Sequence, residues 1–145
     1  MNTSRLKTLA KYLDTVPEET FNLNHWSCGT QACAIGHACS IPSFRKLGLR
    51  LSKGIPGQVH HTPFPVFKDA NSWRAVNKFF GLTFDQSGHL FGAQSYEVGK
   101  GTAKNVAARI RRLSSSHKAA LASVKARQAR WIAAAPVLCS DDGWW

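Results

Sequence analysis

Acidic residues are scarce in this sequence, which has 8 Asp and Glu against 19 Lys and Arg. None of the eight falls between Lys100 and Arg130, where nine basic residues occur. The formal net charge of +11 comes mainly from this stretch, because the first 99 residues carry ten basic and six acidic side chains. Such a charge distribution predicts binding to a polyanion, either nucleic acid or an acidic protein surface.

The sequence also lacks a long apolar run. No stretch approaches the roughly 18 apolar residues of a membrane-spanning helix, and the first residues have no apolar core of the secretory type. We therefore expect no membrane partner and a cytoplasmic location. Four cysteines could form two disulfide bonds, but without an export signal reduced thiols are the expectation.

Apolar residues recur at helical spacing in several segments, and no internal repeat is present. The predicted helices cover residues 5–13, 31–39, 72–80, 84–91, 103–113 and 117–135. Residues 44–51 are expected to pass from a helical turn into a short strand, and Ser114–Ser116 to break or bend the chain. The expected fold is mainly α, a compact single-domain bundle of about five or six short helices with little strand. The domain would cover residues 1–136, including a basic helical pair at 100–135, and a tail would follow at 137–145.

The segment His25–Ser40 contains three of the four cysteines and no Asp, Glu, Lys or Arg. Thr30 is expected to cap a short helix over 31–39. That helix is apolar on almost all sides, which predicts a buried helix at the centre of the bundle. Gly36 lies inside it, and we expect another element to approach closely there because glycine has no side chain.

Three interpretations of the cysteines and histidines in this segment remain open. The first is core packing without a cofactor, because free cysteine behaves as a small apolar residue. The second is a zinc site formed by Cys28, Cys33 and His37 with His25 or Cys39, although the spacing is not the usual pair of C-x2-C knuckles. The third is catalysis by Cys28 or Cys33 with His37 as base, in which the start of the helix would activate Cys28. The segment contains no C-x-x-C, which excludes the common redox and haem-attachment motifs.

The two C-terminal helices supply the candidate polyanion-binding residues. These are Lys100, Lys104, Arg109, Arg111, Arg112, Lys118, Lys125, Arg127 and Arg130. In the second of these helices Leu121, Val124 and Trp131 share a face that also includes Gln128.

Residues 137–145 combine Asp141 and Asp142 with Trp144 and Trp145. Two interpretations are open for this tail. The tryptophans could fold back onto the domain, since tryptophan is highly buried on average. Alternatively, Trp144 and Trp145 could dock into a basic, apolar pocket on a partner.

The pattern W-x-C-G-T-x-x-C-A-x-G-H-A at Trp26–Ala38 resembles one found in small uncharacterised proteins of bacteriophages and bacteria. Those proteins also have an R-L-x-x-L-A-x-Y-L helix, an F-F-G-L…L-F segment and a V-A-x-R-I helix. The corresponding residues here are Arg5–Leu13, Phe79–Phe91 and Val106–Ile110. The resemblance implies a phage or bacterial setting, hence a bacterial cytoplasm, and implies no particular activity.

These observations favour a small basic, non-enzymatic binding protein, a phage or bacterial accessory protein that contacts nucleic acid or another polyanion through its C-terminal helices. One alternative is a phage-type inhibitor that binds an acidic host protein. The other is a Cys/His hydrolase or transferase that uses the segment from Cys28 to His37.

Overall fold

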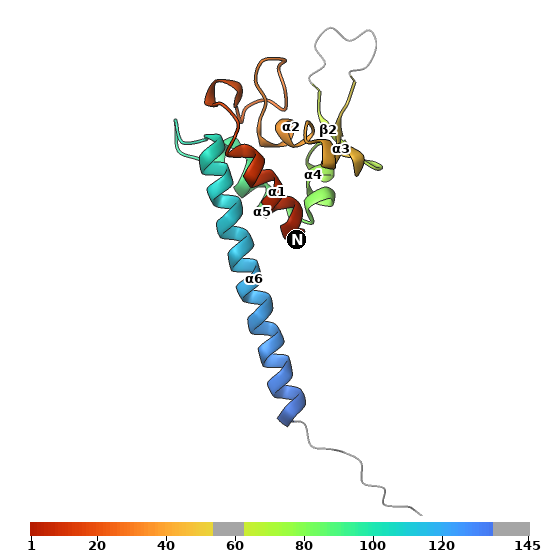
Figure 1. The fold of residues 1–145 in the computed structure, drawn as a ribbon, viewed down its shortest axis with the longest axis vertical. Coiled ribbons are helices and arrows are strands. Elements are labelled where there is room, and N and C mark those ends of the chain that lie inside the picture. Colours follow the sequence, from red (N-terminus) through yellow and green to blue (C-terminus); the bar gives the residue numbers. More distant parts are fainter. Residues whose placement is uncertain (54–62, 135–145) are drawn as a thin grey trace, which may run out of the picture. The chain divides into compact units, whose positions relative to one another are not determined.

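The computed structural model describes residues 1–53 and 63–134 of the chain. Within this part the fold is mainly α, as predicted, with one small sheet (Figure 1). The helices are α1 (Thr3–Leu13), α2 (Ala34–Ala38), α3 (Pro42–Lys46), α4 (Ser72–Phe80), α5 (Phe84–Phe91) and α6 (Ala103–Ala134), with 3-10 turns η1 (Glu18–Thr20) and η2 (Ala93–Ser95). The strands β1 (Arg50–Leu51), β2 (Pro65–Phe67) and β3 (Ala70–Asn71) form an antiparallel sheet in the order β1-β2-β3.

Local sequence signals account for the ends of most helices. The Asn2 side chain accepts a hydrogen bond from the backbone of Arg5 and so caps α1. Thr83 and Gln86 form the reciprocal capping box at the start of α5. Gly81 ends α4 in the left-handed conformation that glycine adopts without strain. The capping side chains of Asn2, Thr83 and Gln86 satisfy backbone N–H groups that the starts of helices leave without intrahelical partners.

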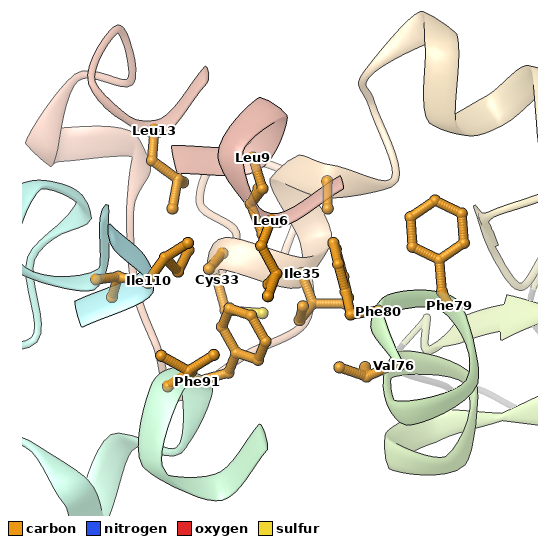
Figure 2. Close-up of a cluster of buried hydrophobic side chains, with 14 of the residues drawn as sticks. Leu6, Leu9, Leu13, Cys33, Ile35, Val76, Phe79, Phe80, Phe91 and Ile110 are labelled. Carbon is orange, nitrogen blue, oxygen red and sulfur yellow. The ribbon is translucent and has the colours of Figure 1, made fainter. Parts of the chain in front are cut away.

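The chain divides into two compact units, Met1–Ser114 and Ser115–Trp145, each of which is described by itself. In the first unit a single apolar core joins α1, α2, α4, α5 and the beginning of α6 (Figure 2). Labelled members of this core are Leu6, Leu9, Leu13, Cys33, Ile35, Val76, Phe79, Phe80, Phe91 and Ile110. Burying one such side chain contributes about 1.5–3 kcal/mol, so the core is the main source of the unit's stability.

The α2 helix lies inside this core, with four of its five residues buried. The prediction of a buried central helix is confirmed, but its predicted bounds, 31–39, are wrong. Thr30 is not the N-cap, because the helix begins at Ala34 after Cys33. The helix α2 ends at Ala38, and Pro42 begins α3 at a position where its missing N–H has no cost.

The predicted break at Ser114–Ser116 is absent, and α6 is one continuous helix. Serine lowers helix stability by only about 0.5 kcal/mol per residue relative to alanine. The flanking segments are good helix formers and contain no glycine or proline between Ala103 and Ala134. The expected basic pair of helices at 100–135 is therefore a single helix. The first compact unit ends at Ser114, earlier than the expected 136, and residues 137–145 lie outside the described part.

Candidate functional site

Cys33 occupies a structural position at the start of α2. Its Sγ accepts a hydrogen bond from the backbone N–H of Gly36 at 3.4 Å, so the thiol acts as the helix N-cap. The same sulfur lies 3.9 Å from the carbonyl oxygen of Trp26. Burial raises the pKa of the Cys33 thiol, and it raises that of Cys39 to about 12. Both thiols are therefore neutral core groups at physiological pH.

Gly36 is enclosed by the loop that precedes the helix. A Cβ atom placed on it would lie 1.8 Å from the carbonyl oxygen of Trp26 and 2.8 Å from the Cβ of Ala32. No side chain fits at that distance. The predicted close approach at Gly36 is thus confirmed, and it fixes the loop from Trp26 to Ala32 against α2.

His37 is also held by the protein. Its Nε2 lies 3.0 Å from the carbonyl oxygen of Thr20, and because a carbonyl can only accept, this nitrogen carries the proton. The ring stacks on Phe21 with centroids 6.0 Å apart and an interplanar angle of 10°. Nε2 is consequently not available as a base or as a metal ligand in this arrangement.

Cys28 differs from the other two described cysteines because it is exposed. It lies on a turn next to Gly29, which has a φ of 92°. The backbone of Gln31, then the hydroxyl and backbone of Thr30, hold the pKa of the Cys28 thiol below its usual value. The expected cause, the start of a helix, is wrong because α2 begins only at Ala34.

The residues considered for zinc are not brought together. Within residues 1–53 and 63–134, no group of three or more His, Cys, Asp or Glu side chains is placed to hold a metal ion. The set Cys28, Cys33, His37 and His25 is dispersed, because Cys33 and His37 take part in core contacts while Cys28 faces solvent. The described side-chain partner of the Cys28 thiol is the Thr30 hydroxyl, and the His37 ring contacts Thr20 and Phe21, so no described contact joins Cys28 to His37.

A cavity of about 390 Å³ lies beside the central segment. It is lined by the loop from Leu23 to Trp26, by Cys33, by Trp73 of α4 and by the stretch from Phe91 to Gln94. Trp26 and Trp73 meet there edge to face with centroids 5.0 Å apart. The volume is within the range of small-molecule sites, but the polar groups described at Cys33 are already used within the protein.

Arg109 is the most firmly held of the nine candidate polyanion-binding residues. Its guanidinium donates hydrogen bonds to the backbone oxygen of His89 at 2.8 Å and to Ser95 Oγ and O at 2.9 and 2.6 Å. The guanidinium carbon also lies 3.6 Å from the ring centroid of Tyr96. Tyr96 in turn donates to the carbonyl of Leu90 at 2.6 Å. Arg109 therefore fastens the turn after α5 to α6.

Two further candidates have acidic partners. Arg111 forms a two-pronged ion pair with Asp14, which follows α1. The Arg111 guanidinium lowers the pKa of the Asp14 carboxyl below its ordinary value. Lys100 pairs with Glu97 at 3.1 Å in the turn before α6.

The other six candidates are exposed on α6. No hydrogen bond or ion pair joins them to another side chain in the part of the chain that the structure describes. They are Lys104, Arg112, Lys118, Lys125, Arg127 and Arg130. Lys104 and Arg112 belong to the first unit and the other four to the second. Residues 103–134 contain no acidic residue, so the exposed charges of α6 have one sign in each unit.

The second unit adds a feature that charge counting does not identify. Every residue from Lys118 to Ala134 is exposed, including Leu121 and Val124 at 49%, Trp131 at 77% and Ile132 at 64%. The shared face of three of these residues was evident in the sequence, but its exposure was not. The regular spacing of Leu121, Val124 and Trp131 by three and seven residues is the signal that could have identified a helix-pairing surface.

Comparison of this chain with protein-family models, with curated proteins and with solved structures finds no match.

Among the helices of the described part, none combines the length and the apolar character needed to cross a membrane.

Proposed function

We propose that this protein is a non-enzymatic binding protein that contacts a polyanion, in the first place nucleic acid, through the exposed cations of α6. The observation that carries the proposal is the presence of six exposed cations on a helix that has no acidic residue. Phosphate groups repeat at regular intervals along a nucleic acid, and each contact with Lys or Arg releases condensed counterions.

The internal contacts of the basic region make the proposal more specific. Arg109 and Arg111 are engaged with Ser95 and Asp14, so the binding surface comprises the other cations of the helix. We expect this surface to contact backbone phosphates, which fix the position of a protein on nucleic acid but carry no sequence information. The expected binding is therefore strongly salt-dependent and shows little sequence preference.

The Cys/His alternative has less support. An enzyme of that kind needs a thiolate within hydrogen-bond reach of a base. The thiol with the lowered pKa, Cys28, is exposed on its turn, and its described side-chain partner is the Thr30 hydroxyl and not a histidine. The thiol of Cys33 is buried and caps α2.

A fluorescence anisotropy titration with a labelled DNA or RNA oligonucleotide tests the proposal. For duplex DNA, the logarithm of the binding constant should fall against the logarithm of salt concentration with a slope of up to about −5, since each phosphate contact contributes about −0.9. Arg127→Gln together with Arg130→Gln should reduce the magnitude of that slope by up to about 2.

A matched control is available on α1, where Lys7 and Lys11 are exposed cations. Lys7→Gln with Lys11→Gln removes the same net charge, and it should leave the slope almost unchanged. Absence of binding at low salt would overturn the proposal. So would an equal loss of affinity in the α6 and α1 variants, because it would mean that only net charge matters.

A further inference from the structure

The apolar face of the second unit follows a heptad repeat. Counting along α6, His117, Leu121, Val124, Gln128 and Trp131 are separated by four, three, four and three residues. This is the a/d spacing with which one helix pairs with another in a coiled coil. Leu121 and Gln128 take a positions, and His117, Val124 and Trp131 take d positions. We call these five residues the seam.

Four of the five seam residues are exposed within the described part of their unit, and His117 is half-buried. Leu121 and Val124 are each 49% exposed and Trp131 is 77% exposed. The first twelve residues of the same helix show the opposite, since Val106 and Ile110 on their apolar stripe are 0% exposed. Apolar side chains at helix-pairing spacing are usually covered, so the seam is a surface without a described occupant.

The charges beside the seam indicate the occupant. Lys118 and Lys125 fall at e positions on one flank, where the next e position is the exposed Ile132, and Arg127 falls at a g position on the other flank. In coiled coils the e and g residues form the ion pairs that select a partner. The opposite face of the helix carries small residues, with Ala119 and Ala126 at f positions. The cations are thus placed on both flanks of the seam.

From this arrangement we infer that the seam is the docking surface for an α-helix of a partner protein with apolar a and d residues and Asp or Glu at its e and g positions. Apolar contact along the seam supplies the attraction, and the three flanking cations select an acidic partner. This inference does not depend on nucleic-acid binding, because its apolar contacts come from the seam, although Lys118, Lys125 and Arg127 belong to both surfaces.

A second copy of this chain fits the seam less well. Residues 115–134 contain four cations and no acidic residue. Pairing two such segments would bring like charges together and would form no ion pair between them, which is unfavourable in coiled coils and other interfaces. The same charges complement an acidic helix, so a heterotypic pair is favoured.

The two polar residues of the seam support a helix as the occupant. Gln128 lies among apolar neighbours at an a position, and His117 lies at a d position. A polar residue at such a position lowers stability but fixes the register and the number of helices in a coiled coil. Phosphates need only the cations, and a base that stacked on Trp131 would not need Leu121 and Val124 at pairing spacing. A membrane surface selects a wider apolar face than the a/d seam.

The test uses the full chain and a synthetic peptide as the probe. The peptide has three heptads with Leu at a and d and Glu at e and g, and a control peptide carries Lys at e and g. Isothermal titration calorimetry at neutral pH should show one acidic peptide bound per chain. The Lys peptide should bind at least tenfold more weakly.

Variants of the chain separate the seam from its flanks. Leu121→Ser with Val124→Ser should weaken binding of the acidic peptide at least tenfold. The control variant, Ala119→Ser with Ala126→Ser, introduces two serines on the opposite face of the helix. It should leave the affinity for the acidic peptide within about twofold of wild type, since neither residue lies at an a, d, e or g position. Lys118→Glu with Lys125→Glu should reverse the preference, so that the Lys peptide binds more tightly than the Glu peptide.

Several results would overturn the inference. One is equal binding of the two peptides, or equal binding by the seam variant and its f-position control. Another is concentration-dependent self-association of the chain that Leu121→Ser with Val124→Ser abolishes, because the occupant would then be a second copy. A third is loss of thermal stability in the seam variant alone, because the seam would then pack within the chain.

Two further measurements distinguish the other classes of partner. Binding to anionic vesicles of phosphatidylcholine and phosphatidylglycerol that depends on Leu121 and Val124, without binding of the acidic peptide, would make the seam a membrane surface and overturn the inference. Loss of oligonucleotide binding in the seam variant would make it part of a nucleic-acid site, with the same consequence. Retained oligonucleotide binding together with lost peptide binding is the expected result.

Discussion

The two parts of α6 have similar composition and opposite environments. In residues 103–114 the apolar stripe, including Ala103, Val106 and Ile110, is fully buried. In residues 115–134 the corresponding side chains are exposed. Both parts are basic, alanine-containing and helical. Helix formation and burial are therefore separate properties here, and only burial distinguishes a structural element from a surface available to a partner.

The cations show the same difference. In the first part Arg109 and Arg111 are fixed by Ser95, Tyr96 and Asp14, while Lys104 and Arg112 are exposed. In the second part the cations have no partner among the described residues. The contribution of a basic residue to binding thus depends on whether the rest of the fold already uses it, which net charge does not reveal.

The largest expected effect compares one apolar residue from each part of the helix. Ile110→Ala should lower the free energy of unfolding by about 2–5 kcal/mol, since it leaves a cavity in the core. Leu121→Ala should change it by less than about 0.5 kcal/mol, as for other exposed positions. Urea denaturation of the two variants measures both values. A similar loss in both would contradict the comparison.

Gly36→Ala tests the packing of the first unit without removing any atom. The new Cβ would overlap the carbonyl oxygen of Trp26, which belongs to the backbone and cannot rotate away. We expect a loss of about 3 kcal/mol or more. Gly88→Ala is the matched control, because no atom lies within 4 Å of a Cβ at that helical position, and it should stabilise the protein by up to about 1 kcal/mol. Equal effects in thermal denaturation would show that α2 has room to shift.

A third pair of variants compares a fixed cation with a free one. Arg109→Gln removes three hydrogen bonds and the contact with Tyr96, and should cost about 2 kcal/mol of stability. Arg127→Gln should leave stability within about 0.5 kcal/mol and should weaken oligonucleotide binding. Chemical denaturation and fluorescence anisotropy of both variants check these expectations. A loss of stability in Arg127→Gln, with stability unchanged in Arg109→Gln, would contradict the assignment of the six free cations.

The smallest effect concerns the ion pair of Asp14 and Arg111, whose side chains are 43% and 50% exposed. Asp14→Asn should cost less than about 1 kcal/mol at neutral pH, because solvent screens an exposed pair. Arg111 lowers the pKa of the Asp14 carboxyl in the folded state below its ordinary value. The stabilisation by the ion pair is therefore present above the pKa that Asp14 has in the unfolded chain. It is lost as the pH falls through the pKa that Asp14 has in the folded state. The stability difference between wild type and variant should therefore vanish in acid. A difference that persists there would contradict an electrostatic origin.

Much of the fold could be predicted because its signals are local. The periodicity of Leu6, Leu9 and Leu13, the capping box at Thr83 and the terminal Gly81 each act within one or two helical turns. The bounds of α2 could not be predicted in this way. They depend on the loop at Trp26, which approaches Gly36 and places the Cys33 thiol as a cap.

The candidate site was predicted less completely for the same reason. Sequence spacing put Cys28, Cys33 and His37 near one helix start, but the separation of Cys28 from the other two follows from tertiary contacts with Thr20 and Gly36. Likewise, nothing near Arg109 in the sequence indicates that Ser95 and Tyr96 receive its guanidinium. The interpretation of Cys33 and Cys39 as core residues agrees with their burial, whereas Cys28 is exposed.

The continuity of α6 through Ser114–Ser116 has a consequence for hydrogen exchange. Helix nucleation is the unfavourable step in forming a helix, while each added residue extends an existing one at little cost. The packed residues 103–114 thus serve as a permanent nucleus for residues 115–134, whose backbone hydrogen bonds receive no protection from a core. Amide protection should decline gradually from Ser114 towards Ala134, with opening free energies falling towards zero. A partner that binds the outer turns would extend protection outward along the same helix, so the exchange profile would show how far the bound surface reaches.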